Sequence, residues 1–485
     1  MAILVLGFLV DYGTLKNMQV FKLSCCDPQL LDKYKAEMAY GFERFFLLSY
    51  CLACCWPGFG AQKQLRVVRQ WAEMEFNFPD EDLRRHATDQ RFYVPGNSVP
   101  IDVEVEHRHG KKGSRIFVSL PRFDEGRPVT LGTVDEHGRI SGYPDYSWHD
   151  NQGYNCRGMT SVFRTAIDTC NRLWVMDTGK IGERQLCPPQ LLAFDLNTDT
   201  LAYRHVINAT SYIATSLFIT PVVDVRGAVP DDCGNTFVYV GDVSGFSILV
   251  VDVANSRSWR VTHRLMFPYP QHGTFTIDGE SFDLMDGVLG MALSPYQRKQ
   301  DRYLYFHSLA ATTENVIRTS VLRNESFIRD PNARPDSINV FPGERPNQAA
   351  AEAMDKDGIL YFGIMDPPSI WCWNSATEFS QSNFHKVAED RETLQFASGM
   401  KVINNLKGEQ ELWVLTSSFQ RVMTGSLNSE KVNFRIHAEK IPNLLENSPC
   451  RQIPKGRAFG HQANLIIPEG GYRVPLLRYG AVAYL

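Results

Sequence analysis

The chain has 485 residues, 50 of them basic and 54 acidic, so its formal net charge is −4. Hydrophobic residues make up 44% and charged residues 21%, which is typical of a globular protein with a sizeable core and excludes collagen-like or low-complexity chains. The near-neutral balance, without a long basic run, argues against nucleic acid or an anionic membrane surface as a partner.

The N-terminal segment differs in character from the rest of the chain. Residues 45–61 are apolar, but the stretch is too short and too interrupted to span a bilayer. Read from Met38, it has the layout of a secretory signal peptide that ends at small residues, Gly58-Phe59-Gly60. We therefore expect residues 38–61 to be a signal peptide and residues 1–37 to be a non-native extension. The alternative is a cytosolic N-terminus with a buried apolar helix.

Six cysteines follow this segment, an even number that fits disulfide bonds in a secreted protein. Six cysteines allow 15 pairings, and the sequence does not choose among them. None of these six cysteines forms a Cys-x-x-Cys pair, and the histidines show no cluster at metal-ligand spacing, so no metal site or cofactor is expected. Two sequons predict glycosylation at Asn208 and Asn324. The candidate disulfide cysteines are Cys156, Cys170, Cys187, Cys233, Cys372 and Cys450.

One short motif recurs six times in the remainder of the chain. Each copy is an aliphatic-aromatic-aliphatic run bounded by turn-forming residues, which favours a strand over a helix. Neighbouring copies are separated by 52 to 66 residues. Their aromatic anchors are Phe117, Trp174, Tyr239, Tyr305, Tyr361 and Trp413.

A second strand, rich in small residues, precedes most of these anchors, as at 286–293 and 396–402. Small side chains allow several strands to converge on one axis, and aromatic rings fill the wedges between sheets. We therefore predict an all-β, single-domain, six-bladed β-propeller over residues 71–450. The alternative is a set of chance aromatic strands in two β-sandwiches. The tail, 451–485, has no blade pattern; it wraps the propeller, is tied through Cys450, or is mobile.

Catalytic motifs of the common enzyme classes are absent, so the candidate site rests on the expected fold. Propellers usually bind ligands at the mouth of the central channel, where the inner and second strands end. Aromatic rings and carboxylates at such a mouth would suit a cationic, ring-bearing ligand. For any single acid, the alternative is solvation or a hairpin hydrogen bond at a strand end. The candidates are Asp102, Glu104, Thr160, Ser161, Asp177, Asp242, Glu352, Phe396, Ser398, Ser417 and Phe419.

Several longer motifs give the chain a family resemblance from about Trp71 to Cys450. They include Ile116-Phe-Val-Ser-Leu-Pro-Arg122, Cys170-Asn-Arg-Leu-Trp-Val-Met-Asp-Thr-Gly179, Cys187-Pro-Pro-Gln-Leu-Leu-Ala-Phe-Asp-Leu196 and Asp286-Gly-Val-Leu-Gly-Met-Ala-Leu-Ser-Pro295. In these motifs and their order the chain resembles the insect Yellow and major royal jelly protein family. The resemblance implies a secreted propeller that acts in cuticle or eggshell pigmentation.

The resemblance leaves three functional classes open. The first is dopachrome conversion in melanin synthesis, for which Asp177, Asp242 or Glu352 would be the base. The second is the binding of a small aromatic amine or quinone-type ligand by the channel mouth. Amine-binding relatives have an Asn and a Phe where this chain has Ser417 and Phe419, so the aromatic is kept and the amide is lost. The other binding candidates are Thr160, Phe396 and Ser398. The third class is a structural cuticle protein. The oligomeric state is not indicated.

Overall fold

The computed structural model describes residues 65–108, 113–150, 152–297, 300–326 and 337–451. The expected extension, the expected signal peptide and the tail beyond residue 451 lie outside these ranges. Within them, no helix has both the length and the apolar character needed to cross a membrane.

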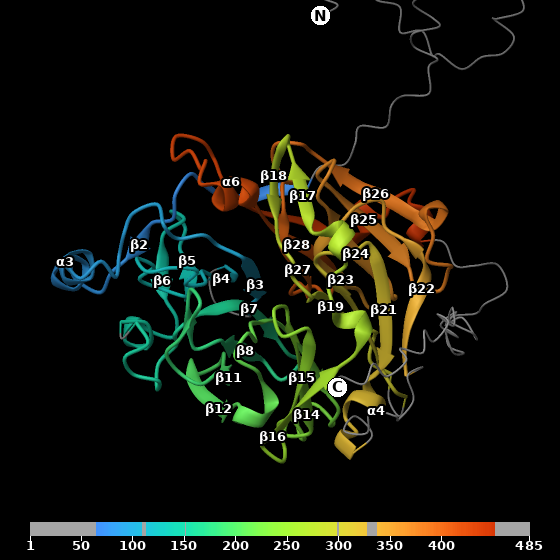
Figure 1. The fold of residues 1–485 in the computed structure, drawn as a ribbon, viewed down its shortest axis with the longest axis horizontal. Helices are drawn as coiled ribbons and strands as arrows, with labels where there is room; N and C mark the ends of the chain where they lie inside the picture. The colour runs from blue at the N-terminus through green and yellow to red at the C-terminus, as the bar shows by residue number, and fades with distance from the viewer. Residues whose placement is uncertain (1–64, 109–112, 151, 298–299, 327–336, 452–485) are drawn as a thin grey trace, which may run out of the picture. The chain divides into compact units, whose positions relative to one another are not determined.

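Six sheets of four or five strands surround a common axis (Figure 1). Blade 1 contains β3 (Asp102–Glu106), β4 (Arg115–Ser119), β5 (Leu131–Val134), β6 (Ile140–Gly142) and β2 (Phe76–Asn77); blade 2 contains β7 (Val162–Ile167), β8 (Arg172–Asp177), β11 (Gln190–Asp195) and β12 (Thr200–Val206); blade 3 contains β13 (Phe218–Val225), β14 (Thr236–Asp242), β15 (Ser247–Asp252) and β16 (Arg257–Thr262). Blade 4 contains β19 (Val288–Leu293), β20 (Tyr303–Ser308), β21 (Thr313–Arg318) and β22 (Ile338–Glu344); blade 5 contains β23 (Ala349–Met354), β24 (Ile359–Ile364), β25 (Ser369–Asn374) and β26 (Phe384–Glu389); blade 6 contains β27 (Ala397–Asn404), β28 (Gln410–Ser417), β29 (Phe434–Lys440) and β1 (Arg66–Trp71).

The first strand of each blade is the innermost one. Each inner strand contacts the inner strands of the two neighbouring blades, and β27 of the last blade contacts β3 of the first. The ring is therefore closed, and the predicted six-bladed propeller is confirmed.

The six aromatic anchors predicted from the repeat occupy the second strand of every blade: β4, β8, β14, β20, β24 and β28. All six side chains are buried, the most exposed being Trp413 at 5%. Their rings pack with hydrophobic residues of the neighbouring blades, as Tyr239 does in a cluster with Val288 and Phe306. The repeat thus supplies the packing between blades, as the sequence pattern predicts.

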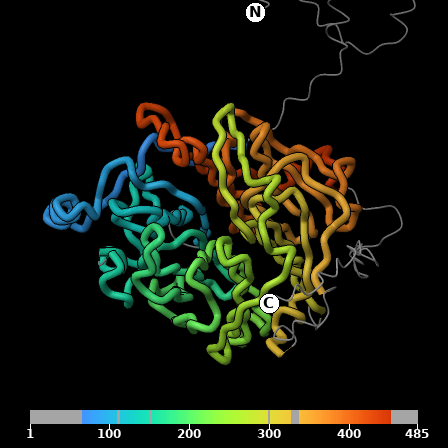
Figure 2. The backbone as a smooth tube through the Cα atoms, in the orientation of Figure 1, coloured from blue at the N-terminus to red at the C-terminus, as the bar shows by residue number. Residues whose placement is uncertain are grey.

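Strand β1 closes the ring from the other end of the sequence. It pairs with β29 in antiparallel register, so the blue and red ends of the described chain meet in one blade (Figure 2). Trp71 lies opposite Phe434. The Trp71 indole donates a hydrogen bond of 2.6 Å to the Gly138 carbonyl in blade 1, so one side chain ties the last blade to the first. This strand begins at Arg66, upstream of the expected propeller start at residue 71.

Short helices and hairpins occupy the connections between strands. The longest described helix is α3 (Glu81–Asp89), capped by Asp80, whose carboxylate accepts the Leu83 backbone N–H at 2.7 Å. The other α-helices are α4 (Thr319–Leu322), α6 (Phe419–Thr424) and α7 (Ile441–Leu444). The 3₁₀ helices are η2 (Tyr146–Trp148), η3 (Ala209–Ser211), η4 (Arg264–Met266), η5 (Pro270–His272), η6 (Gln381–Asn383) and η7 (Pro449–Arg451). Two hairpins pair β9 (Lys180–Ile181) with β10 (Arg184–Gln185) and β17 (Thr274–Ile277) with β18 (Glu280–Asp283).

All six expected cysteines form disulfides. The pairs are Cys156–Cys187, Cys170–Cys233 and Cys372–Cys450. The third bond joins β25 of blade 5 to η7, which ties the segment after the last blade to the ring. The tail beyond residue 451 lies outside the described residues, so the alternatives for it stay predictions.

We expect Trp71→Ala to lower the unfolding free energy by about 3–5 kcal/mol, because it removes a buried indole and the hydrogen bond that seals the ring. Val67→Ala, on the same strand but 39% exposed, should change it by less than about 0.5 kcal/mol. Denaturant unfolding monitored by fluorescence and circular dichroism measures both. Equal unfolding midpoints for the two variants would contradict the closure role of Trp71.

Candidate functional site

A single arginine lies across the centre of the ring. Arg164, on β7, is 4% exposed, and its Nη1 atom donates to Thr220 Oγ1 at 2.7 Å and to the Leu289 carbonyl at 3.0 Å. Its Nη2 atom donates to the Ser398 carbonyl. These acceptors lie on β13, β19 and β27, in three other blades, so the guanidinium occupies the axis and separates the two ends of the channel. Burial lowers the pKa of Arg164 to about 10, which leaves it charged at neutral pH.

Five phenylalanines pack together where the inner strands begin, and we call this the aromatic end. Phe396 and Phe419 stack with their ring centroids 4.4 Å apart. Phe282 lies 5.9 Å and Phe123 6.3 Å from the Phe419 ring, and Phe163 lies 5.4 Å from Phe123. The structure therefore brings together the two aromatic residues predicted from sequence. It adds three that sequence reasoning missed, since Phe123 and Phe282 lie outside the repeated strands.

The backbone at Phe396 is held in an unusual conformation. Its φ is +35°, in the left-handed region that residues with a Cβ rarely adopt, a strain of about 1–3 kcal/mol. The neighbouring Gln395 fixes the loop, because its Oε1 atom accepts from Ser418 Oγ at 3.2 Å and from Gln420 Nε2 at 3.0 Å. Such strain concentrates at functional sites, where surrounding contacts hold it in place.

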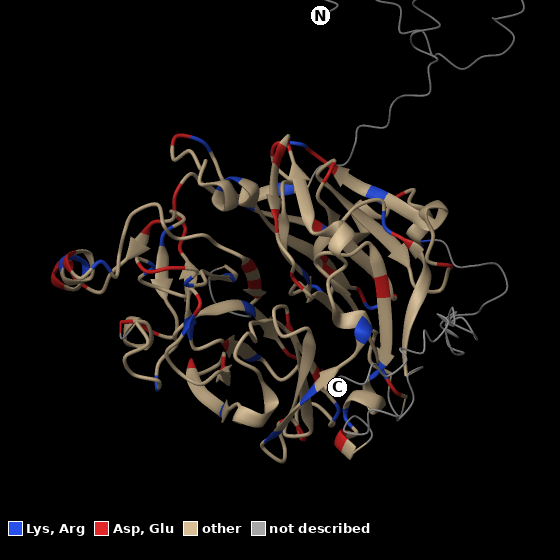
Figure 3. Cartoon of the chain, viewed as in Figure 1, with Lys and Arg blue, Asp and Glu red and all other residues tan. Residues whose placement is uncertain are grey.

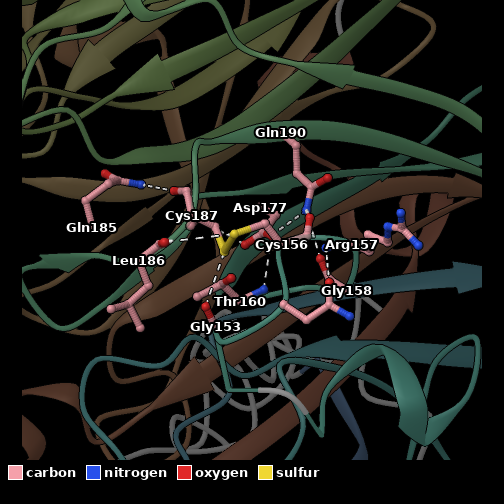
Figure 4. The surroundings of a disulfide bond; sticks show 12 residues. Gly153, Cys156, Arg157, Gly158, Thr160, Asp177, Gln185, Leu186, Cys187 and Gln190 are labelled. Carbon is pink, nitrogen blue, oxygen red and sulfur yellow. Dashed lines mark hydrogen bonds between the residues drawn. A yellow bond between two sulfur atoms is a disulfide. The ribbon is translucent and has the colours of Figure 1, made fainter.

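Three hydroxyl groups predicted to bind a ligand are buried without a hydrogen-bond partner among the described residues. They belong to Thr160, Ser398 and Ser417, each at most 2% exposed. Ser398 and Ser417 lie two residues from Phe396 and Phe419 along the chain. Thr160 lies elsewhere, beside Asp177 and the Cys156–Cys187 disulfide (Figure 4). A buried hydroxyl without a partner costs about 1–3 kcal/mol, so these groups favour a polar ligand.

Two of the carboxylates predicted as bases end the second strands of blades 2 and 3. Asp177 accepts the backbone N–H groups of Thr160, Ser161 and Gly179 and the Gln190 amide, at 2.7 to 3.2 Å. Asp242 likewise accepts four hydrogen bonds, from the backbone of Leu217 and Gly245 and from the hydroxyls of Ser216 and Ser247. Both side chains are fully buried. These bonds use the oxygen lone pairs, so both aspartates stabilise the turns at the ends of their blades.

The third predicted base, Glu352, belongs to a buried network. His307 Nδ1 lies 3.0 Å from Glu352 Oε2 and 3.2 Å from Glu314 Oε2, while its Nε2 atom donates to the Ala349 carbonyl at 3.0 Å. Arg345 Nη1 lies 2.5 Å from Glu314 Oε2. Burial and Arg345 lower the pKa of His307, but Glu352 and the hydrogen bonds to both carboxylates outweigh them, so its pKa is raised.

His307, Glu314 and Glu352 also form the one group among the described residues whose ligand atoms are close enough to hold a metal ion. Burial and the neighbouring Glu314 raise the pKa of Glu352, while the Arg345 guanidinium lies against Glu314. Arg345 thus supplies charge that a metal ion would otherwise bring. We assign the cluster a structural role.

An acid that sequence reasoning did not single out lies near the aromatic end. Asp286 precedes β19, and its carboxylate forms no hydrogen bond or ion pair with the described residues. Burial, with a further contribution from Glu183, raises its pKa to about 7. Glu183 follows Gly182, whose N–H donates at 3.0 Å to the carbonyl of Arg122, the residue before Phe123. Glu183 therefore lies in the turn that adjoins the aromatic end, and its charge acts on Asp286. In the sequence, Asp286 is distinguished only as an acidic residue two positions before an inner strand begins.

Both glycosylation candidates are exposed. Asn208 caps η3, and its side-chain oxygen accepts from the Thr210 backbone N–H at 3.0 Å. Asn324 lies just after α4. Glycosylation at both positions stays a prediction.

The fold and the site define a six-bladed β-propeller with an aromatic end and a buried, charged centre. The profile of the family described as major royal jelly protein matches residues 160–450. The chain belongs to this family, which includes the Yellow proteins.

Three curated relatives illustrate the range of the family. Major royal jelly protein 9 of Apis mellifera is 31% identical over 81% of this chain and 92% of its own length. Dopaminechrome tautomerase of Drosophila melanogaster is 29% identical over 84% and 89%. Protein yellow of Drosophila melanogaster is 28% identical over 88% and 77%. Among solved structures, aldose sugar dehydrogenase from Streptomyces coelicolor has a TM-score of 0.38 at 10% identity, over 78% of this chain and 99% of that one.

The raised pKa of His307 predicts a loss of stability at alkaline pH. Histidine in an unfolded chain has a pKa of about 6.5, whereas folded His307 keeps its proton to higher pH because its pKa is raised. Its contribution is therefore complete below about pH 6.5 and is lost as pH rises through the folded pKa. His307→Gln should flatten this decline in unfolding free energy, measured by denaturant titration across pH. His137→Gln, at an exposed position, is the control. An unchanged slope for the His307 variant would refute the protonated network.

Proposed function

We propose that the protein is a secreted pigmentation-pathway propeller that converts an aminochrome, such as dopaminechrome or dopachrome, to the corresponding dihydroxyindole at its aromatic end. The observation that carries the proposal is the strained, stacked pair Phe396 and Phe419, with the unpaired hydroxyls of Ser398 and Ser417 beside it. The Drosophila relative named dopaminechrome tautomerase supports this choice of substrate class.

Secretion is supported by the three disulfides, because such bonds persist in oxidising compartments and are rare in the cytosol. The expected signal peptide at residues 38–61 and the exposed sequons at Asn208 and Asn324 agree with it. The neutral distribution of charge around the ring, where both signs are interspersed (Figure 3), suits a small uncharged or singly charged substrate better than a polyelectrolyte.

The chemistry needs a flat binding surface and a base. An aminochrome is an isomer of its dihydroxyindole, so the reaction needs no oxidant: a base removes a proton from a ring carbon, the electron pair moves into the quinone, and a quinone oxygen takes up a proton. Asp286 suits the base, because a carboxylate whose pKa is about 7 is ionised enough to act and basic enough to accept a carbon-bound proton. Hydroxyls of Ser398 and Ser417 suit the developing oxyanion as donors.

The same arrangement also supports a second function, the binding of aromatic amines without turnover. Phenylalanine faces attract an ammonium group, and Asp286 is an available counter-charge. Ser417 stands where amine-binding relatives are expected to have an amide, which weakens this alternative. A structural cuticle role remains the third candidate and requires neither a ligand at the aromatic end nor a base.

Asp286→Asn should lower the rate of dopaminechrome conversion by about 10²- to 10⁴-fold, the usual contribution of a general base. The wild-type rate should rise with pH through about 7 as Asp286 ionises. Loss of the visible absorbance of dopaminechrome measures the rate. Asp283→Asn changes an exposed acid on β18 and serves as the matched control.

Calorimetric titration with dopamine and serotonin separates the alternatives. Saturable binding with no acceleration above the spontaneous reaction would indicate an amine carrier rather than an enzyme. If the protein shows neither binding nor acceleration, the structural role is the remaining candidate. If the protein is active and the Asp286 and Asp283 variants have equal rates, another residue is the base.

A further inference from the structure

The channel contains a second hollow on the other side of Arg164 from the aromatic end. It has a volume of about 270 Å³ and is lined by residues of all six inner strands. Five half-buried apolar side chains surround it toward the ends of these strands: Ile167, Val223, Leu293, Met354 and Val402. Arg164 lines its inner part, so we call it the inner cavity.

Three polar side chains in the inner cavity have an atom without a hydrogen-bond partner among the described residues. These atoms are Asp102 Oδ1, Glu352 Oε1 and Arg164 Nε, on side chains of residues that are 1%, 5% and 4% exposed. Acidic residues of β3 lie beside the axis in Figure 3. Two of the three unpaired atoms are oxygens of acidic side chains, which accept hydrogen bonds when ionised. The lining also holds Glu104 and the basic side chains of Arg302 and Lys401, so acidic and basic residues are equal in number.

The other oxygens of these carboxylates are already bonded. Asp102 Oδ2 lies 3.0 Å from Lys401 Nζ and accepts the Thr165 backbone N–H at 3.0 Å. Glu352 Oε2 is bonded to His307. Both side chains are thus fixed in position, and each presents one free acceptor. A buried carboxylate oxygen without a donor is costly, and a donor that also carries positive charge compensates it best.

We propose that the inner cavity is a second binding site, for a small primary ammonium compound with a short apolar body. The ammonium group would donate to Asp102 Oδ1 and Glu352 Oε1, and its hydrocarbon part would lie against the ring of apolar side chains. The volume is below the roughly 300–1,000 Å³ of drug-sized ligand pockets, so the occupant is small. This site is separated by Arg164 from the aromatic end and does not depend on the proposed tautomerase activity.

Isothermal titration with n-butylammonium chloride tests the proposal on the full-length secreted protein. We expect saturable binding with a Kd of about 1 mM or below, and at least tenfold weaker binding of n-butanol, which lacks the charge. Asp102→Asn should weaken binding at least tenfold. Phe419→Leu changes the aromatic end and should leave it unaltered.

A second variant keeps the test valid if Asp102→Asn does not fold. Ala166 lines the inner cavity two residues from Arg164 on the same face of β7, so Ala166→Phe should fill the cavity and abolish binding without removing a charge. Thermal unfolding checks that each variant is folded. The absence of saturable binding, equal binding of n-butanol, retention of binding in the folded Ala166 variant, or its loss in Phe419→Leu would each overturn the proposal.

Discussion

The convergence of six inner strands on one axis is the constraint on which the rest of the structure depends. Strands meet this closely only where side chains are small: a Cβ at Gly399 of β27 would lie 2.6 Å from Asp102 Oδ1 of β3, in the neighbouring blade. The crowding also forces buried charges at the axis to find partners across blades. Arg164 does so with three strands at once, and β1 then closes the ring that holds them in place.

This geometry separates two chemical environments in one channel. At the aromatic end, rings from several blades and connections pack around the strained Phe396, near hydroxyls that have no hydrogen-bond partner among the described residues. Beyond Arg164, the cavity has apolar walls with fixed acidic and basic side chains. A flat, conjugated substrate matches the first environment, and a small cation matches the second. Asp177 and Asp242 belong to neither, since their hydrogen bonds hold the turns of their blades.

The fold was more predictable from sequence than the site. The six anchors are local signals, because each lies in a short strand bounded by turns. The even number of cysteines can be counted directly in the sequence. Pairing of β1 with β29 joins residues more than 360 positions apart, which no local pattern records. Phe396 and Phe419 were predicted, whereas Phe123, Phe282 and Asp286 lie in connections whose positions only the closed ring fixes. The sequence does not distinguish an aspartate that caps a turn, such as Asp242, from one that forms no hydrogen bond with the described residues, such as Asp286.

The central claim is that the aromatic end is the functional mouth of the channel. A crystal structure of the protein soaked anaerobically with 5,6-dihydroxyindole, the product expected from dopaminechrome, tests it most directly. The account predicts an indole ring against Phe419, with its oxygens near Ser398 or Ser417 and its five-membered ring toward Asp286. An indole bound only outside this end of the ring, or an aromatic end left unchanged at saturating product, would contradict it.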